Sequence, residues 1–282
     1  MWKAFSMSIS LDTTVALHGT IQIPLLGFGT FRVRDGQDVE EAVATALDLG
    51  YRHIDTAVIY RNEEGVGRAV AASGIDRSEI FVTTKVWNSD QGHEPTLRAI
   101  DASLERLGMD YVDLYLVHWP KPAHTPETWR AMEEIQDSGR ARAIGVSNYL
   151  THHLDQLLEN ANVVPSINQI QFHPHLQSPD LVDYCDDRGI VIEAWGPLKQ
   201  GRIIDDPEVA AIAATHGVTV PQVVLRWMLQ RGVVAIPKSV TPSRIAENAD
   251  LYGFELSSDE IAVINAMDRD DRVGAHPDYI DF

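Results

Sequence analysis

Short apolar segments alternate with amphipathic stretches along the whole chain. Each of eight strand-length segments is followed by a stretch whose apolar residues recur at helical spacing. In EEGVGRAVAAS, for example, Val66, Ala69 and Val70 share one helical face, and Asn62 stands at the expected N-cap. The predicted strands are Leu25–Phe28, Tyr51–Asp55, Ile80–Lys85, Tyr111–Val117, Ala143–Val146, Ile167–Ile170, Val191–Trp195 and Val234–Ile236. The helices are expected to begin near Gln37, Glu63, Gly92, Thr125, Leu150, Ser178, Pro207 and Pro242.

This alternation predicts an α/β fold with a parallel sheet and right-handed crossovers. Eight strand–helix units in about 250 residues match the count and size of a (β/α)8 TIM barrel. An open doubly wound sheet is the alternative, but it usually has fewer strands and a glycine-rich dinucleotide turn. We therefore expect one barrel domain that spans residues 1–282.

Three segments are expected to add to the basic barrel. Ahead of the first strand, TTVALHGTIQIP is typical of a β-hairpin with His18 and Gly19 at its turn, placed to plug the barrel floor. Two further helices, Val220–Gln230 and Ser257–Met267, are predicted near the C-terminus.

The composition is that of an ordinary soluble protein, with 44% hydrophobic and 23% charged residues. The sequence has no apolar run of about 18 residues, and MWKAFSMSIS lacks the apolar core of a secretory signal. Met7 offers an alternative start. The chain has a single cysteine, Cys185, so an internal disulfide is excluded. Cys185 is expected to lie on a helix, with its side chain in the hydrophobic core. A cytoplasmic location is predicted.

The net charge of −18 disfavours binding to nucleic acid or to an anionic membrane. An anionic ligand would therefore need a local concentration of positive charge. Lys238 and Arg244 flank a turn that leads into a predicted helix, and this arrangement is typical of an anion site.

Polar residues gather where the predicted strands end. Functional residues of a TIM barrel lie at the C-terminal ends of its strands. Asp55 ends the second strand, Lys85 ends the third and His118 follows the fourth. Further polar or aromatic residues at strand ends are Ser147, Asn148, Gln169, Trp195, Lys238 and Ser239. Each has an ordinary interpretation alone, such as a helix cap or a solvated lysine, but together they indicate one site.

The residues Asp55, Tyr60, Lys85 and His118 suggest a proton-transfer device. A free tyrosine ionises at about 10, and a neighbouring ammonium is expected to lower that value. Asp55 would hold Lys85 charged and in place, while His118 would hydrogen-bond a substrate carbonyl. Tyr60 would then act as a general acid for the reduction of a carbonyl by hydride.

The motifs HIDTAVIYRNEEGVG, TTKVWN, VDLYLVHWP, IGVSNY, NQIQFHP and IPKSVTPSRIAEN resemble those of the aldo-keto reductase family. The resemblance extends from PLLGFGTFR to RVGAHPD and implies a (β/α)8 barrel with Asp55, Tyr60, Lys85 and His118 as the catalytic tetrad. AWGPLKQG, DRVGAHPD and WPKPAH are most similar to bacterial 2,5-diketo-gluconate reductases, although Lys199 replaces a common glycine.

The same resemblance implies NADPH as the cofactor, although GFGTFR lacks the third glycine and the helix of a Rossmann fingerprint. Trp195 stands where a ring, more often a tyrosine, stacks on the nicotinamide. Lys238 and Arg244 favour NADPH over NADH, because they could hold its 2′-phosphate. The residues expected to bind the cofactor are Gly29, Thr30, Ser147, Asn148, Gln169, Trp195, Gly196, Leu198, Gln200, Ile236, Lys238, Ser239, Val240, Thr241, Arg244, Glu247, Asn248 and Arg272. The residues expected to bind the substrate are Phe31, Trp87, His118 and Trp119.

No metal site is expected. The HPH triplet at 173–175 and the pair His152–His153 lack a spaced set of ligand residues, and adjacent side chains should diverge on a helix.

The sequence thus predicts a monomeric, NADPH-dependent reductase of aldehydes and ketones. Candidate substrates are small dicarbonyls, sugar-derived ketoacids such as 2,5-diketo-gluconate, and aromatic aldehydes. One alternative is a regulatory or sensor module that binds NADPH with little turnover. Another is a barrel enzyme that forms a Schiff base at Lys85, as an aldolase does.

Overall fold

The computed structural model describes residues 9–19 and 21–280, so the segment ahead of Met7 lies outside the described residues. Eight parallel strands form one sheet in the order β3 to β10. Their bounds are β3 Phe28–Gly29, β4 His53–Asp55, β5 Phe81–Val86, β6 Val112–Val117, β7 Ala141–Ser147, β8 Ile167–Gln171, β9 Val191–Trp195 and β10 Val234–Ala235. All eight coincide with predicted strands within a few residues.

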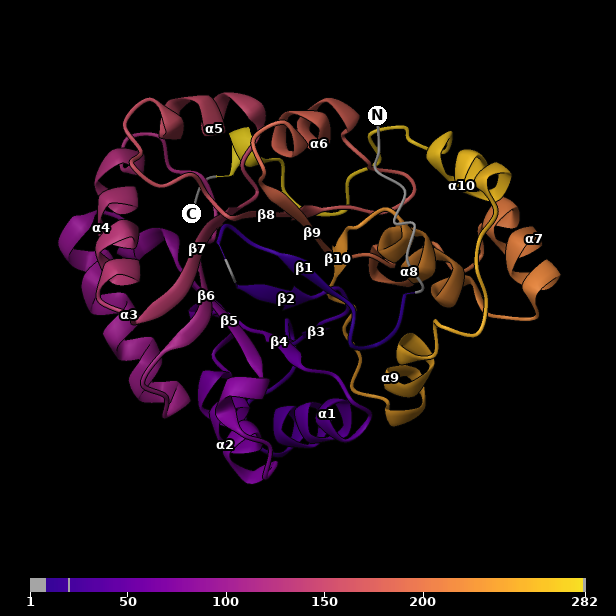
Figure 1. The fold of residues 1–282 in the computed structure, drawn as a ribbon, viewed down its shortest axis with the longest axis horizontal. Coiled ribbons are helices and arrows are strands. Elements are labelled where there is room, and N and C mark those ends of the chain that lie inside the picture. The colour runs from indigo at the N-terminus through magenta and orange to yellow at the C-terminus, as the bar shows by residue number, and fades with distance from the viewer. Residues whose placement is uncertain (1–8, 20, 281–282) are drawn as a thin grey trace.

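The sheet closes on itself at the seam between its first and last strands. Leu26 pairs in parallel with Ala235, and the Gly27 N–H donates a hydrogen bond of 2.8 Å to the Ala235 carbonyl. Residues of the predicted strand Leu25–Phe28 therefore mainly form this closing contact, while β3 itself has only two residues. The result is the expected (β/α)8 barrel, with helices around the strands (Figure 1).

The helices begin at or within one residue of the predicted positions. Those that follow the barrel strands are α1 Gln37–Asp48, α2 Glu63–Ala72, α3 His93–Leu107, α4 Thr125–Asp137, α5 Thr151–Leu158, α6 Pro179–Asp186, α7 Pro207–His216 and α9 Pro242–Ala249. The two additional helices are α8 Val220–Gln230 and α10 Ser258–Asn265. The described residues also include the short 3₁₀ helices η1 Val58–Tyr60, η2 Arg77–Glu79, η3 Asn88–Asp90, η4 Lys199–Gly201 and η5 Pro277–Tyr279.

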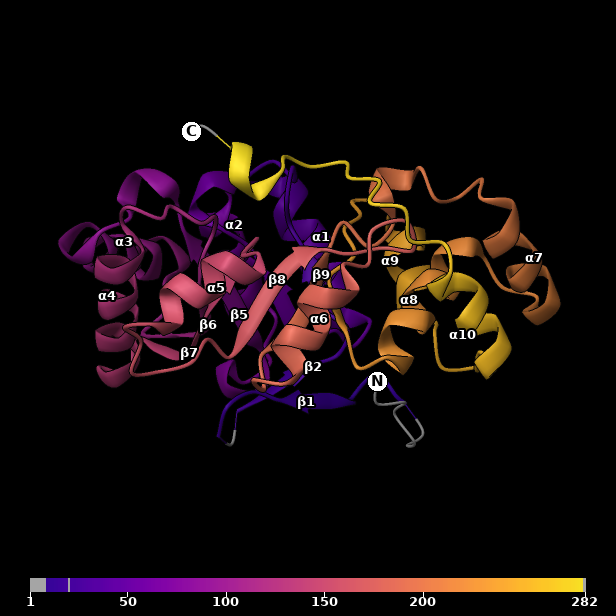
Figure 2. The same cartoon turned by 90° about the horizontal axis from the view of Figure 1, so that it is seen from above.

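The N-terminal hairpin lies across one end of the barrel, as expected. Strands β1 Thr14–Ala16 and β2 Gln22–Pro24 are antiparallel, with Val15 opposite Ile23. Ile23 is fully buried. Figure 2 shows the hairpin below the barrel, on the side away from the C-terminus, so the opposite end stays open for a site.

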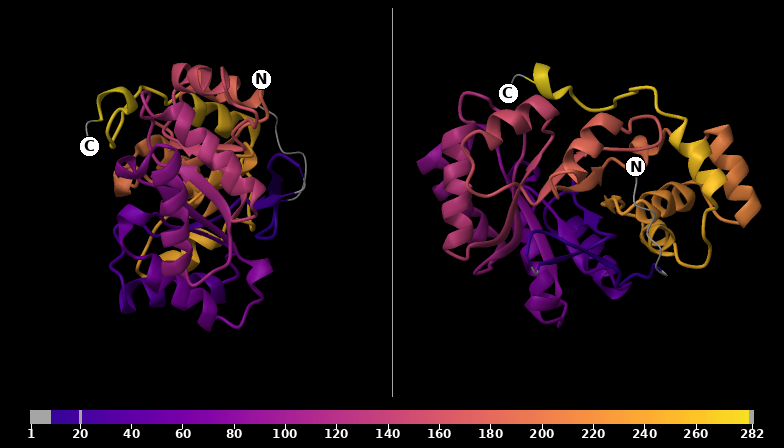
Figure 3. Two further views of the ribbon diagram at one scale, coloured as in Figure 1. Left: turned by 90° about the vertical axis from the view of Figure 1, so that its left-hand side faces the viewer. Right: turned by 45° about the horizontal axis from the view of Figure 1, so that its top comes forward.

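The segment after α10 crosses that open end and finishes with η5 beside α5 (Figures 2 and 3). The Asp271 N–H donates to the His175 carbonyl, and the Gly274 N–H donates to Oε1 of Gln171. The last segment of the chain therefore contacts the same barrel end as the loops that follow the strands.

Burial follows the predicted pattern. All positions of β5 and β6 are buried, as expected for parallel strands covered on both faces. Val66, Ala69 and Val70 are buried on α2, and Cys185 is buried in α6. Among the described residues no single helix is long and apolar enough to cross a membrane; α7 and α8 meet that test of length and composition only as a pair bent by 87°.

The contact between α2 and α3 depends on a glycine. A Cβ atom at Gly67 would lie 2.1 Å from the carbonyl oxygen of Leu107, a backbone atom that cannot rotate away. We expect Gly67→Ala to lower the free energy of unfolding by about 1–3 kcal/mol in urea denaturation. The control is Gly253→Ala, where an added Cβ meets no atom within 4 Å and a change of less than about 1 kcal/mol is expected. Equal effects of the two substitutions would contradict this account of the contact.

Candidate active site

A buried ion pair lies at the C-terminal ends of β4 and β5. Nζ of Lys85 lies 2.8 and 2.7 Å from the two carboxylate oxygens of Asp55, and 2.8 Å from the carbonyl oxygen of Thr56. Lys85 is 0% and Asp55 2% exposed. The lysine therefore uses its three N–H groups inside the protein, as a charge removed from water requires.

Tyr60 lies directly over this pair. It ends η1, in the loop between β4 and α2, and its ring centroid is 5.1 Å from Nζ of Lys85. The prediction that Lys85 lowers the pKa of Tyr60 is wrong. Burial raises that pKa well above its ordinary value, and the negative charges of Asp55 and Glu193 add to the effect. Tyr60 is therefore a neutral phenol near pH 7, which holds a proton that it can donate.

His118 follows β6 and faces Tyr60. The two ring centroids lie 5.7 Å apart, and the Trp87 ring packs edge-on against His118 at 5.1 Å. Burial, with a smaller effect from Lys85, lowers the pKa of His118 well below its ordinary value. The imidazole is thus neutral and can donate one N–H hydrogen bond to a carbonyl oxygen without moving a charge.

Aromatic side chains surround this group. The Phe31 ring lies 5.0 Å from the Tyr60 ring and is 50% exposed, so it stands at the rim. Trp87 is half-buried and Trp119 is buried. The structure therefore brings Phe31 and Trp87 against the proposed tetrad, with Trp119 next to His118 in the chain.

Asn62 has a different role from the predicted one. It occupies the N-cap position of α2, but its side chain makes no cap hydrogen bond. Its amide nitrogen instead donates to the carbonyl oxygens of Thr30 and Val33, at 3.0 Å each, and its amide oxygen accepts from the Thr56 hydroxyl at 2.7 Å. The buried amide thus joins the loops after β3 and β4, next to the lysine's carbonyl partner.

A second layer of polar residues lies beneath the ion pair. Nε2 of Gln169 donates to Asp55 and to Glu193, at 2.8 Å each. Glu193 is completely buried, and its carboxylate lies 3.6 Å from His53. Sequence reasoning missed Glu193 and His53. Glu193 could have been found as the one ionisable residue in the apolar strand VIEAW, whereas His53 shares a strand with Asp55 and had no such mark.

Residues from three strand ends meet where the sequence predicts that the nicotinamide binds, a region named here the nicotinamide corner. The Ser147 hydroxyl donates to the Gln169 carbonyl at 2.8 Å, and the Asn148 amide nitrogen donates to the His118 carbonyl at 2.9 Å. Trp195 donates from its indole to the Asn148 amide oxygen at 2.8 Å. Gln169 donates both amide hydrogens inward, and the described residues give its amide oxygen no hydrogen-bond donor. That oxygen fits an amide donor such as a carboxamide N–H.

The loop after β9 bends through left-handed backbone conformations, with φ of 62° at Gly196, 51° at Lys199 and 55° at Gln200. Lys199 adopts a conformation that favours glycine, as the resemblance to relatives with glycine there would suggest. Its ammonium binds Asp271 and contacts Nδ1 of His175 at 3.0 Å. The lysine thereby attaches this loop, which includes Leu198, to the C-terminal segment.

Cationic residues on the loops after β3 and β10 and at the start of α9 mark a second region, named here the cation corner. Lys238 and Arg244 are both exposed, on either side of the turn that leads into α9. An added Cβ at Gly29 would lie 3.1 Å from the Ile236 carbonyl and 3.8 Å from Cβ of Lys238, so both ends of the barrel seam meet here. Partial burial lowers the pKa of Lys238, and the positive charge of Arg32 lowers it further. Arg32 is exposed, and it was missed as a site residue although it ends the motif GFGTFR.

The remaining predicted cofactor residues are placed in different ways. Thr30 is buried and donates from its hydroxyl to the Asp55 carbonyl at 2.9 Å. Ser239 accepts from the Thr241 N–H at 3.1 Å and is buried, whereas Val240 is exposed. Glu247 accepts from the Thr219 hydroxyl at 2.6 Å, so it faces the start of α8. Arg272 lies outside the cation corner and lines a small cavity with Asn148 and Gln171. Asn248 is buried inside the protein.

The pair His152–His153 is arranged differently from the prediction. The expectation that the two rings diverge is wrong, because their centroids lie 4.0 Å apart and both Nε2 atoms face Oδ1 of Asp278, at 2.9 and 3.3 Å. The three ligand atoms are close enough to hold a metal ion. Nδ1 of His153, however, accepts the Leu150 N–H at 3.2 Å, so the neutral ring carries its proton on Nε2, where a metal would need a lone pair. The described geometry is that of a hydrogen-bonded contact between α5 and the C-terminal segment.

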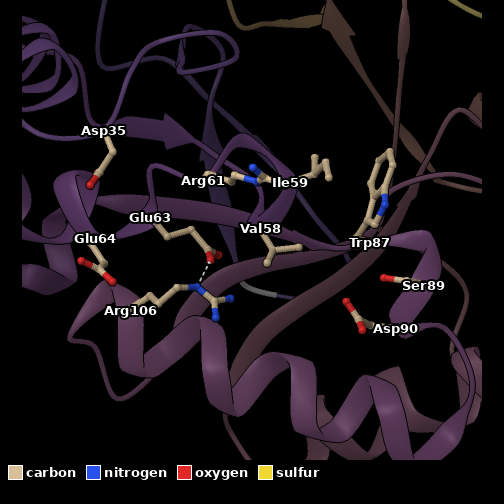
Figure 4. Close-up of a pocket in the computed structure, with 10 residues that line it drawn as sticks. All are labelled: Asp35, Val58, Ile59, Arg61, Glu63, Glu64, Trp87, Ser89, Asp90 and Arg106. Atoms are coloured by element: carbon tan, nitrogen blue, oxygen red, sulfur yellow. Dashed lines mark hydrogen bonds and ion pairs between the residues drawn. The ribbon is translucent and has the colours of Figure 1, made fainter. Parts of the chain in front are cut away.

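A pocket of about 460 Å³ adjoins the site on the side of α2 and α3 (Figure 4). Trp87 forms one wall, and an ion pair of 2.7 Å between Arg106 and Glu63 lies at the other end. Tyr60 and His118 are not among its lining residues. The pocket therefore shares a wall with the tetrad but does not contain it.

The dependence of Asp55 on Lys85 can be measured. We expect Lys85→Met to lower the free energy of unfolding by about 3–5 kcal/mol, because it leaves the Asp55 carboxylate buried without its counter-charge. Adding Asp55→Asn should restore at least about half of that loss in urea denaturation, because the double variant buries no charge at these positions. Additive losses in the double variant would show that the two side chains do not stabilise one another.

Comparisons with known proteins give the family. Residues 25–269 match the Aldo/keto reductase family. The chain is 50% identical over 276 residues to glyoxal reductase of Bacillus subtilis, covering 98% of this chain and all of the relative, and 43% identical over 270 residues to methylglyoxal reductase DkgA of Escherichia coli, covering 94% and 97%. The structure of a Gox0644 mutant in complex with NADPH is 43% identical, with a TM-score of 0.91 and coverage of 96% and 99%. The chain belongs to the aldo/keto reductase family.

Proposed function

We propose that this protein is an NADPH-dependent reductase that converts aldehydes and ketones to alcohols, with Tyr60 as the proton donor. The observation that carries the proposal is the neutral phenol of Tyr60, placed 5.1 Å above the ammonium of a fully buried Lys85–Asp55 pair and beside a neutral His118. When bound, NADPH supplies the hydride. The chain's own residues bind the carbonyl, supply the proton and compensate the charge.

The residues act in a defined order. The N–H of neutral His118 donates a hydrogen bond to the carbonyl oxygen and so orients it. As negative charge builds on that oxygen, the O–H bond of Tyr60 breaks and the proton forms the O–H bond of the alcohol. The Tyr60 oxygen is left negative, and the ammonium of Lys85 stabilises it. Asp55 keeps Lys85 charged and in place throughout.

The nicotinamide corner and the cation corner fit the two ends of NADPH. The amide oxygen of Gln169 can accept from a carboxamide, and Lys238 and Arg244 can bind a phosphate. Arg32 adds a third positive charge near Lys238. These cations supply the local positive charge that an anionic cofactor needs on a protein with a net charge of −18.

The proposed substrates are small dicarbonyls, with sugar-derived ketoacids and aromatic aldehydes as further members of the class. Relatives named glyoxal reductase and methylglyoxal reductase support the first group. The aromatic rings of Phe31 and Trp87 support the last, because they offer flat apolar surfaces beside Tyr60 and His118 respectively. We take the protein to act as a cytoplasmic monomer, as its sequence predicts.

A Schiff base at Lys85 is disfavoured by the same geometry. The amine must be neutral and reach a substrate carbon to attack it. Lys85 is 0% exposed and donates to Asp55 and Thr56. Its role in the proposal is therefore electrostatic.

Substitution of the proton donor tests the mechanism. We expect Tyr60→Phe to lower kcat for methylglyoxal by about 10²–10⁴-fold, because the ring remains and only the donated proton is lost. NADPH affinity, measured by quenching of protein fluorescence, should change by less than about threefold. Tyr111→Phe, at the other end of β6, is the matched control and should retain full activity. Turnover by Tyr60→Phe equal to wild type would assign the proton to another group.

Substitution in the cation corner tests the cofactor preference. We expect Arg244→Ala to raise the Kd for NADPH by about 10–100-fold, because one charged hydrogen bond to phosphate is lost. The Kd for NADH, which lacks the 2′-phosphate, should change by less than about threefold. Arg130→Ala, at an exposed position on α4 paired with Glu127, serves as the control. Equal losses for the two cofactors would place the 2′-phosphate elsewhere.

A further inference from the structure

A second buried carboxyl group lies beneath the proposed catalytic pair. Glu193 projects from β9 and is 0% exposed, and it is paired in register with Gln169 on β8. Its Oε2 accepts the Gln169 amide at 2.8 Å, while Oε1 has no hydrogen-bond partner among the described residues. The tetrad mechanism makes no use of this acid.

Gln169 connects Glu193 to the ion pair. One amide nitrogen donates to Oδ2 of Asp55 and to Oε2 of Glu193, both at 2.8 Å. Because both hydrogens are used, the amide plane is fixed and the nitrogen cannot exchange places with the oxygen. Removal of Glu193 would free one hydrogen and allow the amide to turn.

Among the described residues, no cation is free to pair with a charge on Glu193. The ionisable groups that face it are Asp55 and His53 from β4, Lys85 from β5 and Tyr60 from η1. Lys85 already binds both oxygens of Asp55. His53 lies 3.6 Å away, but burial lowers its pKa to about 3, so it is neutral.

Nε2 of His53, the atom that faces Glu193, also lies 3.1 Å from the Thr83 hydroxyl. As a neutral ring, His53 supplies no counter-charge to Glu193. Burial and the negative charge of Asp55 accordingly raise the pKa of Glu193 to about 8. The acid is largely protonated at neutral pH.

We propose that Glu193 is a positioning residue of the reductase site, which acts as a neutral carboxylic acid to hold the Gln169 amide against Asp55 and thereby presents the Gln169 amide oxygen to the nicotinamide carboxamide. The inference rests on the proposed function, because it assumes that this corner binds the nicotinamide. The neutral form also keeps the total charge of Asp55, Lys85 and Glu193 at zero.

Ionisation of Glu193 has a predictable sign. Loss of its proton as pH rises adds one negative charge beneath Tyr60. That charge opposes the negative charge that develops on the substrate oxygen and on Tyr60, so reduction becomes slower. The pKa of Tyr60 itself is raised well above 10, so Tyr60 does not titrate in this range.

The first experiment compares E193Q, which keeps the shape but cannot titrate, with E193A and with the exposed control E127Q. In wild type and E127Q, kcat should fall above an apparent pKa within about one unit of 8. In E193Q, kcat should change by less than about twofold from pH 6 to 9. E193A should raise the Kd for NADPH about tenfold, and E193Q by less than about threefold. Circular dichroism checks that each variant is folded.

The second experiment needs no cofactor and no turnover. The folded pKa of Glu193 lies above its ordinary value of 4.5, so wild-type protein loses stability as pH rises from about 5 to about 8. Over that range the folding equilibrium constant of E193Q, measured by urea denaturation of the cofactor-free protein, should increase relative to wild type by about tenfold per pH unit.

The outcomes separate the two proposals. If the stabilities of wild type and E193Q change in parallel with pH, the claim that Glu193 is a neutral acid is overturned, whatever the activity. An active wild type whose NADPH affinity is unchanged in E193A overturns the positioning role alone. A wild type that neither binds NADPH nor reduces any carbonyl overturns the proposed function and the positioning role with it, while the stability curves still report the charge of Glu193.

Discussion

The buried ion pair between Lys85 and Asp55 is the constraint on which the rest of the site depends. Two charges removed from water are stable only when each is hydrogen-bonded on every side. The Thr56 carbonyl, the Gln169 amide and the two carboxylate oxygens supply these bonds. Each partner comes from a strand or strand end of the barrel, so the fold itself fixes the ammonium beneath Tyr60.

Two features of the fold position charged residues around this pair: the seam that closes the barrel, and the C-terminal segment of the chain. The seam between β3 and β10 brings Gly29 against Lys238, so cations from the two ends of the sheet meet on a strongly acidic protein. On the other side, Lys199 binds Asp271 and the pair His152–His153 contacts Asp278. These contacts connect the C-terminal segment to the loop after β9 and to α5, which frame the same barrel end.

The differences from expectation share one cause. Spacing placed Tyr60 beside Lys85, but burial raises the pKa of Tyr60, and the negative charges of Asp55 and Glu193 add to that rise. Helical geometry alone would separate His152 from His153, but a carboxylate 125 residues or more downstream draws both rings together. In both cases the deciding partner or environment is remote in the sequence.

The sequence by itself determined the order and bounds of most strands and helices, and the residues that stand at strand ends. Both are local properties: hydrophobic period sets the elements, and parallel strands place their C-terminal ends together. Its motifs also indicated the family. Tertiary structure alone decided that Glu193 from β9 meets His53 and the ion pair inside the barrel, that Arg32 lies near Lys238, and that Asn62 joins two loops instead of capping a helix. Such contacts depend on closure of the barrel, and the charge state of a buried group depends on all its neighbours at once, which no local pattern records.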